Sequence, residues 1–268
     1  MTRRTWEFFR RDLLIEASSR FSLLLQLMNI AITMAGYVFL SRLVEKESLL
    51  RWTPTGDGYF PFVVVGMATS GAMLTALNGL SRGLQLQQSS GVLKPVFFGQ
   101  TRPETVVLLS SVYPVMRAGV DLLIYLAVGS LFGGLSVAGA NLLGAVGVAA
   151  LAIVAFASLG VWAAAFSVLF RWGNPFLWVI GSSSWLLSGV LYPLALLPAP
   201  LRWAAELFPL THALDGLRAA LLAGAPLQEL AVPALWLTGF ILLVAPSGLA
   251  VFNAGLTRTR IHGTLVGG

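Results

Sequence analysis

Long apolar runs separated by short polar segments dominate the sequence. A membrane-spanning helix needs about 20 mainly apolar residues, and six runs reach that length: about 21–41, 59–81, 105–132, 138–170, 174–197 and 229–256. The fourth run is longer than a span needs, so it must tilt or extend past the bilayer, and Pro193 and Pro198 end the fifth. The pattern predicts an all-α integral membrane protein with six transmembrane helices, forming a single domain over residues 1–268.

The segment before the first run carries too many charges to cross a bilayer. Trp6, Phe9, Leu13 and Ala17 nevertheless recur at helical spacing between the charged positions. We therefore predict an interfacial helix over residues 1–20, and the alternative is a plain charged lead-in to the first span. The first run is too long for a typical signal-peptide core, which favours an uncleaved span.

The segment 198–228, between the fifth and sixth runs, reads as a pair of short helices. An amphipathic helix from Leu201 to Phe208 is stopped by Pro209, and a second begins at Thr211, a plausible N-cap, and stops at Gly224. Its many leucines predict that the pair re-enters the outer leaflet. Backbone is tolerated at that depth only where protein or a watery cavity surrounds it.

Composition supports the membrane assignment and excludes other classes. A soluble domain carries about a quarter charged residues, whereas this chain has 10% charged residues, 57% hydrophobic residues and a mean hydropathy of +0.82. It has no cysteine and only His212 and His262 as histidines, which leaves little for thiol chemistry or a metal site. We expect no metal and no catalytic residue.

The distribution of basic residues predicts the orientation. With the N-terminus inside, eleven Lys and Arg residues are cytoplasmic and five are external, so both termini are expected in the cytoplasm. The net charge of +6 lies at membrane boundaries rather than in one patch, which favours lipid headgroups over nucleic acid as the partner. The segment 82–104 is then a cytoplasmic loop.

Ionisable residues within apolar surroundings are costly unless they are paired. Arg117 and Asp121 are one helical turn apart in the third run, which favours a mutual salt bridge over a polar element of a transport path. His212, Asp215 and Arg218 follow at a spacing of three, which favours a helix-stabilising ladder at the outer surface over a role in gating.

Small residues and methionines mark the first two runs. Ala68, Ala72 and Ala76 recur every four residues and allow another helix to approach closely, either within the chain or from a second copy. Four methionines could serve a surface that accommodates varied apolar shapes, although core or lipid-facing methionine is the commoner case; they are Met28, Met34, Met67 and Met73.

Two segments carry ordered motifs that are typical of a known family. The stretch 187–193, LSGVLYP, is followed by Leu197-Pro198, Trp203, the stretch 208–211, FPLT, and the stretch 217–222, LRAALL. This order resembles the ABC type-2 permease family, in which such a turn ends the fifth span and such a helix leads into the sixth, with Phe208 here where asparagine is usual. The resemblance implies that this segment forms the external gate, with the residues Tyr192, Pro193, Pro198, Trp203, Phe208, Pro209, His212, Asp215 and Arg218.

The cytoplasmic loop adds a second match to the same family. It resembles the segment through which such permeases couple to an ATPase, although Lys94 replaces the usual acidic residue. The residues that carry the match are Gly91, Val92, Leu93, Lys94, Pro95, Phe97, Phe98 and Arg102. The family's first, second and fifth spans face the dimer centre, which implies a pore lining from Asn29, Thr33, Ser70, Thr75, Asn78, Ser183, Ser184 and Ser188.

The resemblance implies an export permease of the bacterial cytoplasmic membrane. The chain has no G-x-x-x-x-G-K-[ST] phosphate loop, so ATP and magnesium are expected on two copies of a separate ATP-binding subunit. The permease itself is expected to be a homodimer or a heterodimer with a similar chain. The expected substrate is amphiphilic or hydrophobic, drug or lipid-like. The alternatives are export of a polysaccharide or lipid-linked glycan and, less favoured, an ion-coupled secondary transporter or an intramembrane enzyme.

Overall fold

The computed structural model describes residues 20–43, 58–89, 103–132, 139–169 and 175–261. These residues form helices and no strand, which confirms the all-α prediction for the described part of the chain. The elements are α2 (Arg20–Leu43), α4 (Tyr59–Ser89), α6 (Pro103–Leu131), α7 (Leu142–Leu169), α8 (Pro175–Leu187), the short 3-10 helix η1 (Leu194–Leu196), α9 (Ala199–Glu206), α10 (Pro209–Leu221) and α11 (Ala231–Ile261). The predicted interfacial helix and the coupling residues from Gly91 to Arg102 lie outside the described residues.

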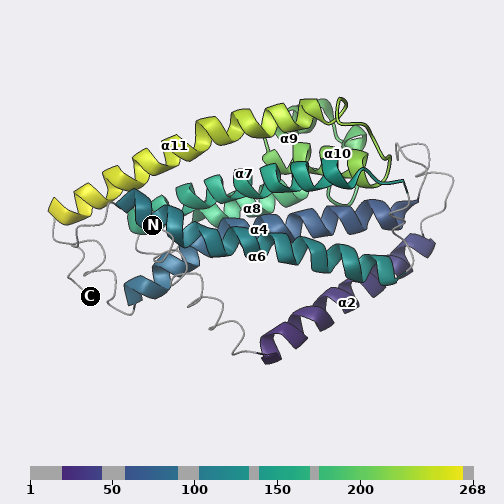
Figure 1. The fold of residues 1–268 in the computed structure, drawn as a ribbon, viewed down its shortest axis with the longest axis horizontal. Helices are drawn as coiled ribbons and strands as arrows, with labels where there is room; N and C mark the ends of the chain where they lie inside the picture. The colour runs from purple at the N-terminus through teal and green to yellow at the C-terminus, as the bar shows by residue number, and fades with distance from the viewer. Residues whose placement is uncertain (1–19, 44–57, 90–102, 133–138, 170–174, 262–268) are drawn as a thin grey trace.

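Five of the described helices are long and apolar enough to cross a membrane: α2, α4, α6, α7 and α11. They lie side by side in an elongated bundle, with α2 at one edge and α11 at the other (Figure 1). Five of the six predicted spans therefore correspond to helices of spanning length. The molecule is an integral membrane protein.

The fifth predicted span is shorter than expected. Helix α8 ends at Leu187 after 13 residues, a length of about 20 Å at 1.5 Å per residue, against a hydrocarbon core of about 30 Å. The fifth predicted span, over 174–197, is therefore not confirmed as a helix of spanning length. The helix stops because Gly189 adopts a φ of +72°, a left-handed conformation that glycine accepts readily.

The predicted helix pair of segment 198–228 exists, but Pro209 has the opposite role from the one predicted. Helix α9 ends at Glu206, and Pro209 is the first residue of α10, where its missing N–H costs nothing. Thr211 is not the N-cap, because Phe208 occupies that position. The Thr211 hydroxyl instead donates a hydrogen bond to the Ala205 carbonyl across the break, at 2.6 Å. It joins the two helices.

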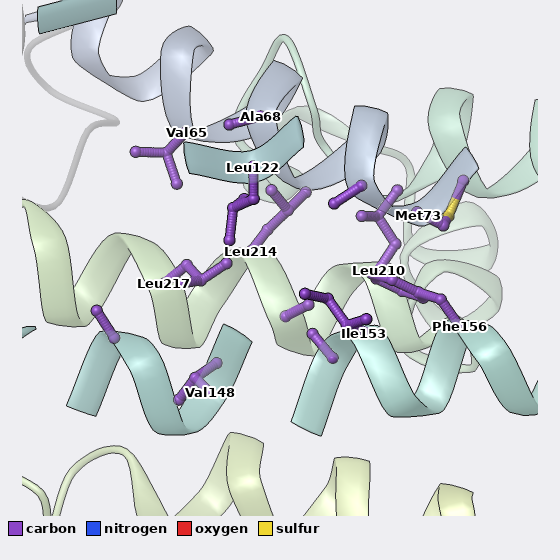
Figure 2. Close-up of a cluster of buried hydrophobic side chains, with 14 of the residues drawn as sticks. Val65, Ala68, Met73, Leu122, Val148, Ile153, Phe156, Leu210, Leu214 and Leu217 are labelled. Atoms are coloured by element: carbon purple, nitrogen blue, oxygen red, sulfur yellow. The ribbon is translucent and has the colours of Figure 1, made fainter. Parts of the chain in front are cut away.

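Helix α10 lies inside the bundle rather than on its surface. Nine of its residues are buried, and Leu210, Leu214 and Leu217 pack among side chains of α4, α6 and α7 (Figure 2). The helix pair lies at the end of the bundle where α4, α7 and α11 begin (Figure 1). The side-chain amide of Asn141, just before α7, donates to the Ala225 carbonyl at 2.8 Å and fastens the segment after α10 to the start of α7.

The small-residue stripe of the second span serves packing within the chain. Ala68, Ala72 and Ala76 are no more than 1% exposed, so the intrachain alternative is confirmed. Of the four methionines, Met34 and Met73 are buried in the core and Met28 is exposed, which agrees with the commoner case of core or outward-facing methionine.

Glycines bring α4 and α6 into close contact along their length. A Cβ atom at Gly79 would lie 2.5 Å from the Cβ of Pro114, and one at Gly71 would lie 3.1 Å from the Tyr125 ring. Near the other end, a Cβ atom at Gly129 would overlap the side chain of Val64. Three glycine contacts therefore hold α4 and α6 together as one unit.

Replacing Gly79 by alanine should destabilise the protein by about 1–3 kcal/mol, because a methyl group would collide with the rigid ring of Pro114. Gly147→Ala in α7 is the matched control, since a Cβ there meets no atom within 4 Å. Thermal unfolding of the purified variants in detergent micelles measures the difference. Equal melting temperatures for the two variants would contradict the close α4–α6 contact.

Candidate functional site

The side chain of Arg218 joins three elements at the end of the bundle that holds the helix pair. Its Nη2 atom donates to the carbonyls of Gly189 and Val190, both at 3.0 Å, and lies 3.3 Å from the Phe62 carbonyl of α4. Its Cζ atom lies 3.4 Å from the centre of the Phe62 ring, a cation–π contact. Arg218 thereby binds α10 to α4 and to the turn that ends α8.

The local sequence around this turn explains why an arginine is needed. The last carbonyls of a helix have no intrahelical partner, and burying them unpaired is costly. The chain turns at Gly189 and brings the Val190 carbonyl against Gly66 of α4. Only glycine leaves room at position 66, because a Cβ there would overlap the Val190 oxygen. The guanidinium then supplies donors to the carbonyls of the turn.

The predicted ladder of His212, Asp215 and Arg218 is not closed by ion pairs among the described residues, although the three side chains lie near enough to interact electrostatically. Arg218 points to the carbonyls of the turn, and Asp215 is exposed and makes no ion pair among the described residues. Burial lowers the pKa of Arg218 to about 9, which leaves the guanidinium charged at neutral pH. The carbonyl dipoles and the Phe62 ring are therefore its main local partners.

His212 joins α10 to α11. Its ring stacks on Trp236 at a centroid distance of 3.9 Å, and Trp236 stacks in turn on Phe240 at 5.4 Å. The Nε2 atom lies 2.9 Å from the Glu206 carbonyl at the end of α9. His212 thus fixes the helix pair to the last span, which sequence reasoning had missed.

The other predicted residues of the external segment occupy different surroundings. The Tyr192 hydroxyl donates to the Leu186 carbonyl and braces the turn after α8. Pro193 and Pro209 are buried, Phe208 is half-buried, and Pro198 and Trp203 are exposed. The structure thus brings some of the predicted gate residues to one turn and leaves others on the surface of α9.

The predicted salt bridge in α6 is confirmed and is part of a larger polar cluster. Arg117 Nε lies 2.9 Å from Asp121 Oδ1, and Thr75 of α4 donates to Asp121 Oδ2 at 2.6 Å. Gln26 of α2 completes the cluster: its amide donates to Asp121 Oδ1 at 2.9 Å and accepts from Arg117. We call these four residues the polar cluster. It connects α2, α4 and α6.

The residues predicted to line a pore do not share one surface. Thr75 lies in the polar cluster, Ser70 is buried and donates to the Met67 carbonyl, and Asn29 is exposed on α2. Ser184 and Ser188 are fully buried, and their hydroxyls have no partner among the described residues. Thr33 and Ser183 are half-buried.

An open groove with a volume of about 710 Å³ lies between α4 and α8. Its lining carries no charged side chain. The residues that line it are Leu74 and Asn78 of α4 and Leu177, Trp178, Gly181, Ser182, Trp185 and Leu186 of α8. Asn78 is the one predicted pore residue among them, and its amide donates to the Leu74 carbonyl at 2.7 Å. The groove therefore combines a mainly apolar wall with an amide, a hydroxyl and the indole rings of two tryptophans.

Comparison with known families decides the class of the protein. The model of the ABC-2 type transporter family matches residues 1–222, which include the predicted coupling segment, the groove and the helix pair. The chain belongs to the ABC-2 type transporter family. No protein among those with curated functions matches it in sequence. The chain is thus the membrane-embedded permease of an ABC exporter.

Sequence reasoning missed several residues that organise the permease. A glutamine within the first span, Gln26, was a signal for a polar partner in a neighbouring helix. Gly189 lies in the predicted turn 187–193, but only the fold shows that Gly66 and Gly189 lie against Arg218.

Replacing Arg218 by methionine should destabilise the permease by about 2 kcal/mol or more, because the carbonyls of the turn after α8 lose a charged donor. Arg202→Met on α9 is the matched control, since Arg202 is exposed and reaches one carbonyl at 3.4 Å. Thermal unfolding in detergent and protease sensitivity of the segment after α8 report the loss. A variant R218M as stable as R202M would contradict the role assigned to Arg218.

Proposed function

We propose that the permease is the transmembrane subunit of an ATP-driven exporter that moves an amphiphilic or hydrophobic substrate, drug or lipid-like, out of the cytoplasm or the inner leaflet. The observation that carries this proposal is the uncharged groove between α4 and α8, which suits an apolar body with one or two polar groups. Its walls are formed by the helices that correspond to the second and fifth predicted spans.

The energy source in this proposal is a separate ATP-binding subunit. The sequence has no phosphate loop, and permeases of this family generally work with such a subunit. The segment 82–104 is its predicted contact. Helix α4 continues without a break from Tyr59 to Ser89, so a displacement at the start of that segment would reach the groove and Gly66 along one rigid element.

The proposed assembly has two copies of the ATP-binding subunit and two permease chains, as a homodimer or with a similar chain. In this proposal both termini lie in the cytoplasm, as the distribution of Lys and Arg predicts. The family resemblance implies that the membrane is the bacterial cytoplasmic membrane. The helix pair α9–α10 is then at the outer surface and acts as the external gate. The burial of α10 among α4, α7 and α11 supports a fixed closure of that end, with α9 on its exposed side.

The other functions considered from sequence receive less support. A glycan exporter would need a path rich in hydrogen-bonding groups, whereas this groove offers one amide, one hydroxyl and the N–H groups of two indole rings in a mainly apolar lining. An ion-coupled transporter would use a carboxylate that can bind and release the ion, whereas Asp121 is held by Arg117, Gln26 and Thr75. An intramembrane serine enzyme would need a serine paired with a histidine, whereas Ser70 donates to a carbonyl of its own helix and His212 is stacked on Trp236.

A transport measurement tests the proposed function. The tagged permease is purified with its ATP-binding subunit and reconstituted in vesicles with a fluorescent cationic dye or an NBD-labelled phospholipid as the probe. We expect ATP-dependent movement of at least one probe, and Gly181→Leu should reduce it, because the new side chain would fill the groove while a Cβ at Gly181 meets only ordinary contacts.

The matched control is Gly147→Leu, a glycine of α7 with no atom near its Cβ position. It should transport like the unmodified permease. Transport that runs on an ion gradient without the ATP-binding subunit would contradict the proposed energy source. Transport of a lipid-linked glycan, with neither probe moved, would favour the glycan exporter.

A further inference from the structure

Helix α2 is the least buried of the five spanning helices that the structure describes. About 11% of its spanning segment is buried within the chain, against 78% for α4. By contrast, the glycine contacts Gly79–Pro114, Gly71–Tyr125 and Gly129–Val64 pack α4 directly against α6. The described part of the permease therefore combines a closely packed α4–α6 unit with a helix, α2, that contacts it over a small area.

The contacts of α2 lie on one narrow stripe. Gln26, Ile30 and Met34 follow at intervals of four residues, so they share one face of the helix. Ile30 and Met34 are buried against Phe60 and Val64, and Gln26 is the member of the stripe that bonds to the polar cluster. Along this stripe, α2 is thus held by a polar contact at Gln26 and, one and two turns further on, by an apolar contact at Ile30 and Met34.

The polar cluster is asymmetric in a way that permits release of α2. The ion pair between Arg117 and Asp121 lies within α6, and Thr75, which bonds to Asp121, comes from α4. Removing Gln26 leaves these contacts in place, so no buried charge loses its countercharge when α2 moves. The Gln26 amide adds hydrogen bonds, and a single hydrogen bond between membrane helices contributes only modestly to the free energy of association. A contact of this strength can form and break reversibly.

We propose that Gln26 is a positioning residue that docks α2 on the α4–α6 unit through Asp121 and Arg117, and that α2 leaves and regains this position during each transport cycle. The docking itself follows from the contacts of the polar cluster, while the cyclic movement rests on the proposed function. The apolar contact of Ile30 and Met34 guides the return of the helix, and the amide fixes its register against Asp121.

The first experiment measures docking in the permease alone. The chain has no cysteine, so spin labels can be attached at Ile32 of α2 and Leu123 of α6, both exposed. Labelled chains are diluted with unlabelled chains in lipid nanodiscs, so that distances within one chain dominate. Gln26→Leu should broaden the distribution of label distances and lower the ratio of docked to undocked α2 by about threefold to twentyfold.

Three controls separate docking from a general loss of structure. Ser41→Ala, on the same helix, removes a hydroxyl that donates only to Val38 of α2 and should leave the distribution unchanged. A second label pair at Leu123 and Val154 of α7 should not respond to Q26L. The double variant Q26E with D121N exchanges amide and carboxylate across the contact and should restore the docked distribution. An unchanged distribution in Q26L, or no rescue by the double variant, would overturn the proposal that Gln26 docks α2.

The second experiment adds the ATP-binding subunit and traps nucleotide with vanadate. The distance between labels at Ile32 and Leu123 should shift on trapping, while the pair at Leu123 and Val154 should stay constant. A constant distance for both pairs would overturn the cyclic movement. If no ATP-binding subunit associates with the permease, the proposed function fails, whereas the first experiment still decides whether Gln26 docks α2.

Discussion

The hydrogen bonds from Arg218 to the carbonyls after α8 are the interaction on which the rest of the structure depends. Helix α8 stops after 13 residues, within an apolar bundle where unpaired carbonyls are costly. By supplying donors there, Arg218 allows the chain to turn at Gly189 and to return as α10 into the core. The helix pair can then close one end of the bundle instead of lying loosely upon it.

The bundle has a closely packed core and two helices, α2 and α8, that pack against it less extensively. Glycine contacts and the buried leucines of α10 bind α4, α6, α7 and α10 into one core. Helix α2 joins that core through a single stripe, and α8 leaves an open groove beside α4. An exporter needs both properties, because a rigid element must transmit the movement of its ATPase while another element gives way to the substrate.

The long apolar runs predicted most of the fold because their length alone requires a helix in a bilayer. The sequence could not show that α8 ends early, since the run from Pro175 onward stays apolar beyond Leu187 and the stop depends on Gly189 meeting Arg218. Pro209 was misread for a related reason, because a proline can end one helix or begin the next.

Residues of the candidate site were predictable to the extent that their partners are near in sequence. The Arg117–Asp121 pair is one turn apart and was predicted correctly. Gln26 and Arg218 bond to residues far along the chain, so their roles appear only when the helices are assembled. Arg218 makes no ion pair with Asp215 in the structure, because its guanidinium bonds to carbonyls that are distant in the sequence.

The central claim is that α9 and α10 close the external end of an export permease while α4 reaches the ATPase at the other end. Single cysteines at Glu206 and at Ser89, introduced into the cysteine-free chain in intact cells, test it directly with a membrane-impermeant maleimide. The account predicts labelling from outside at position 206 and labelling at position 89 only after the cells are opened. The reverse pattern, or labelling of both positions from outside, would contradict it.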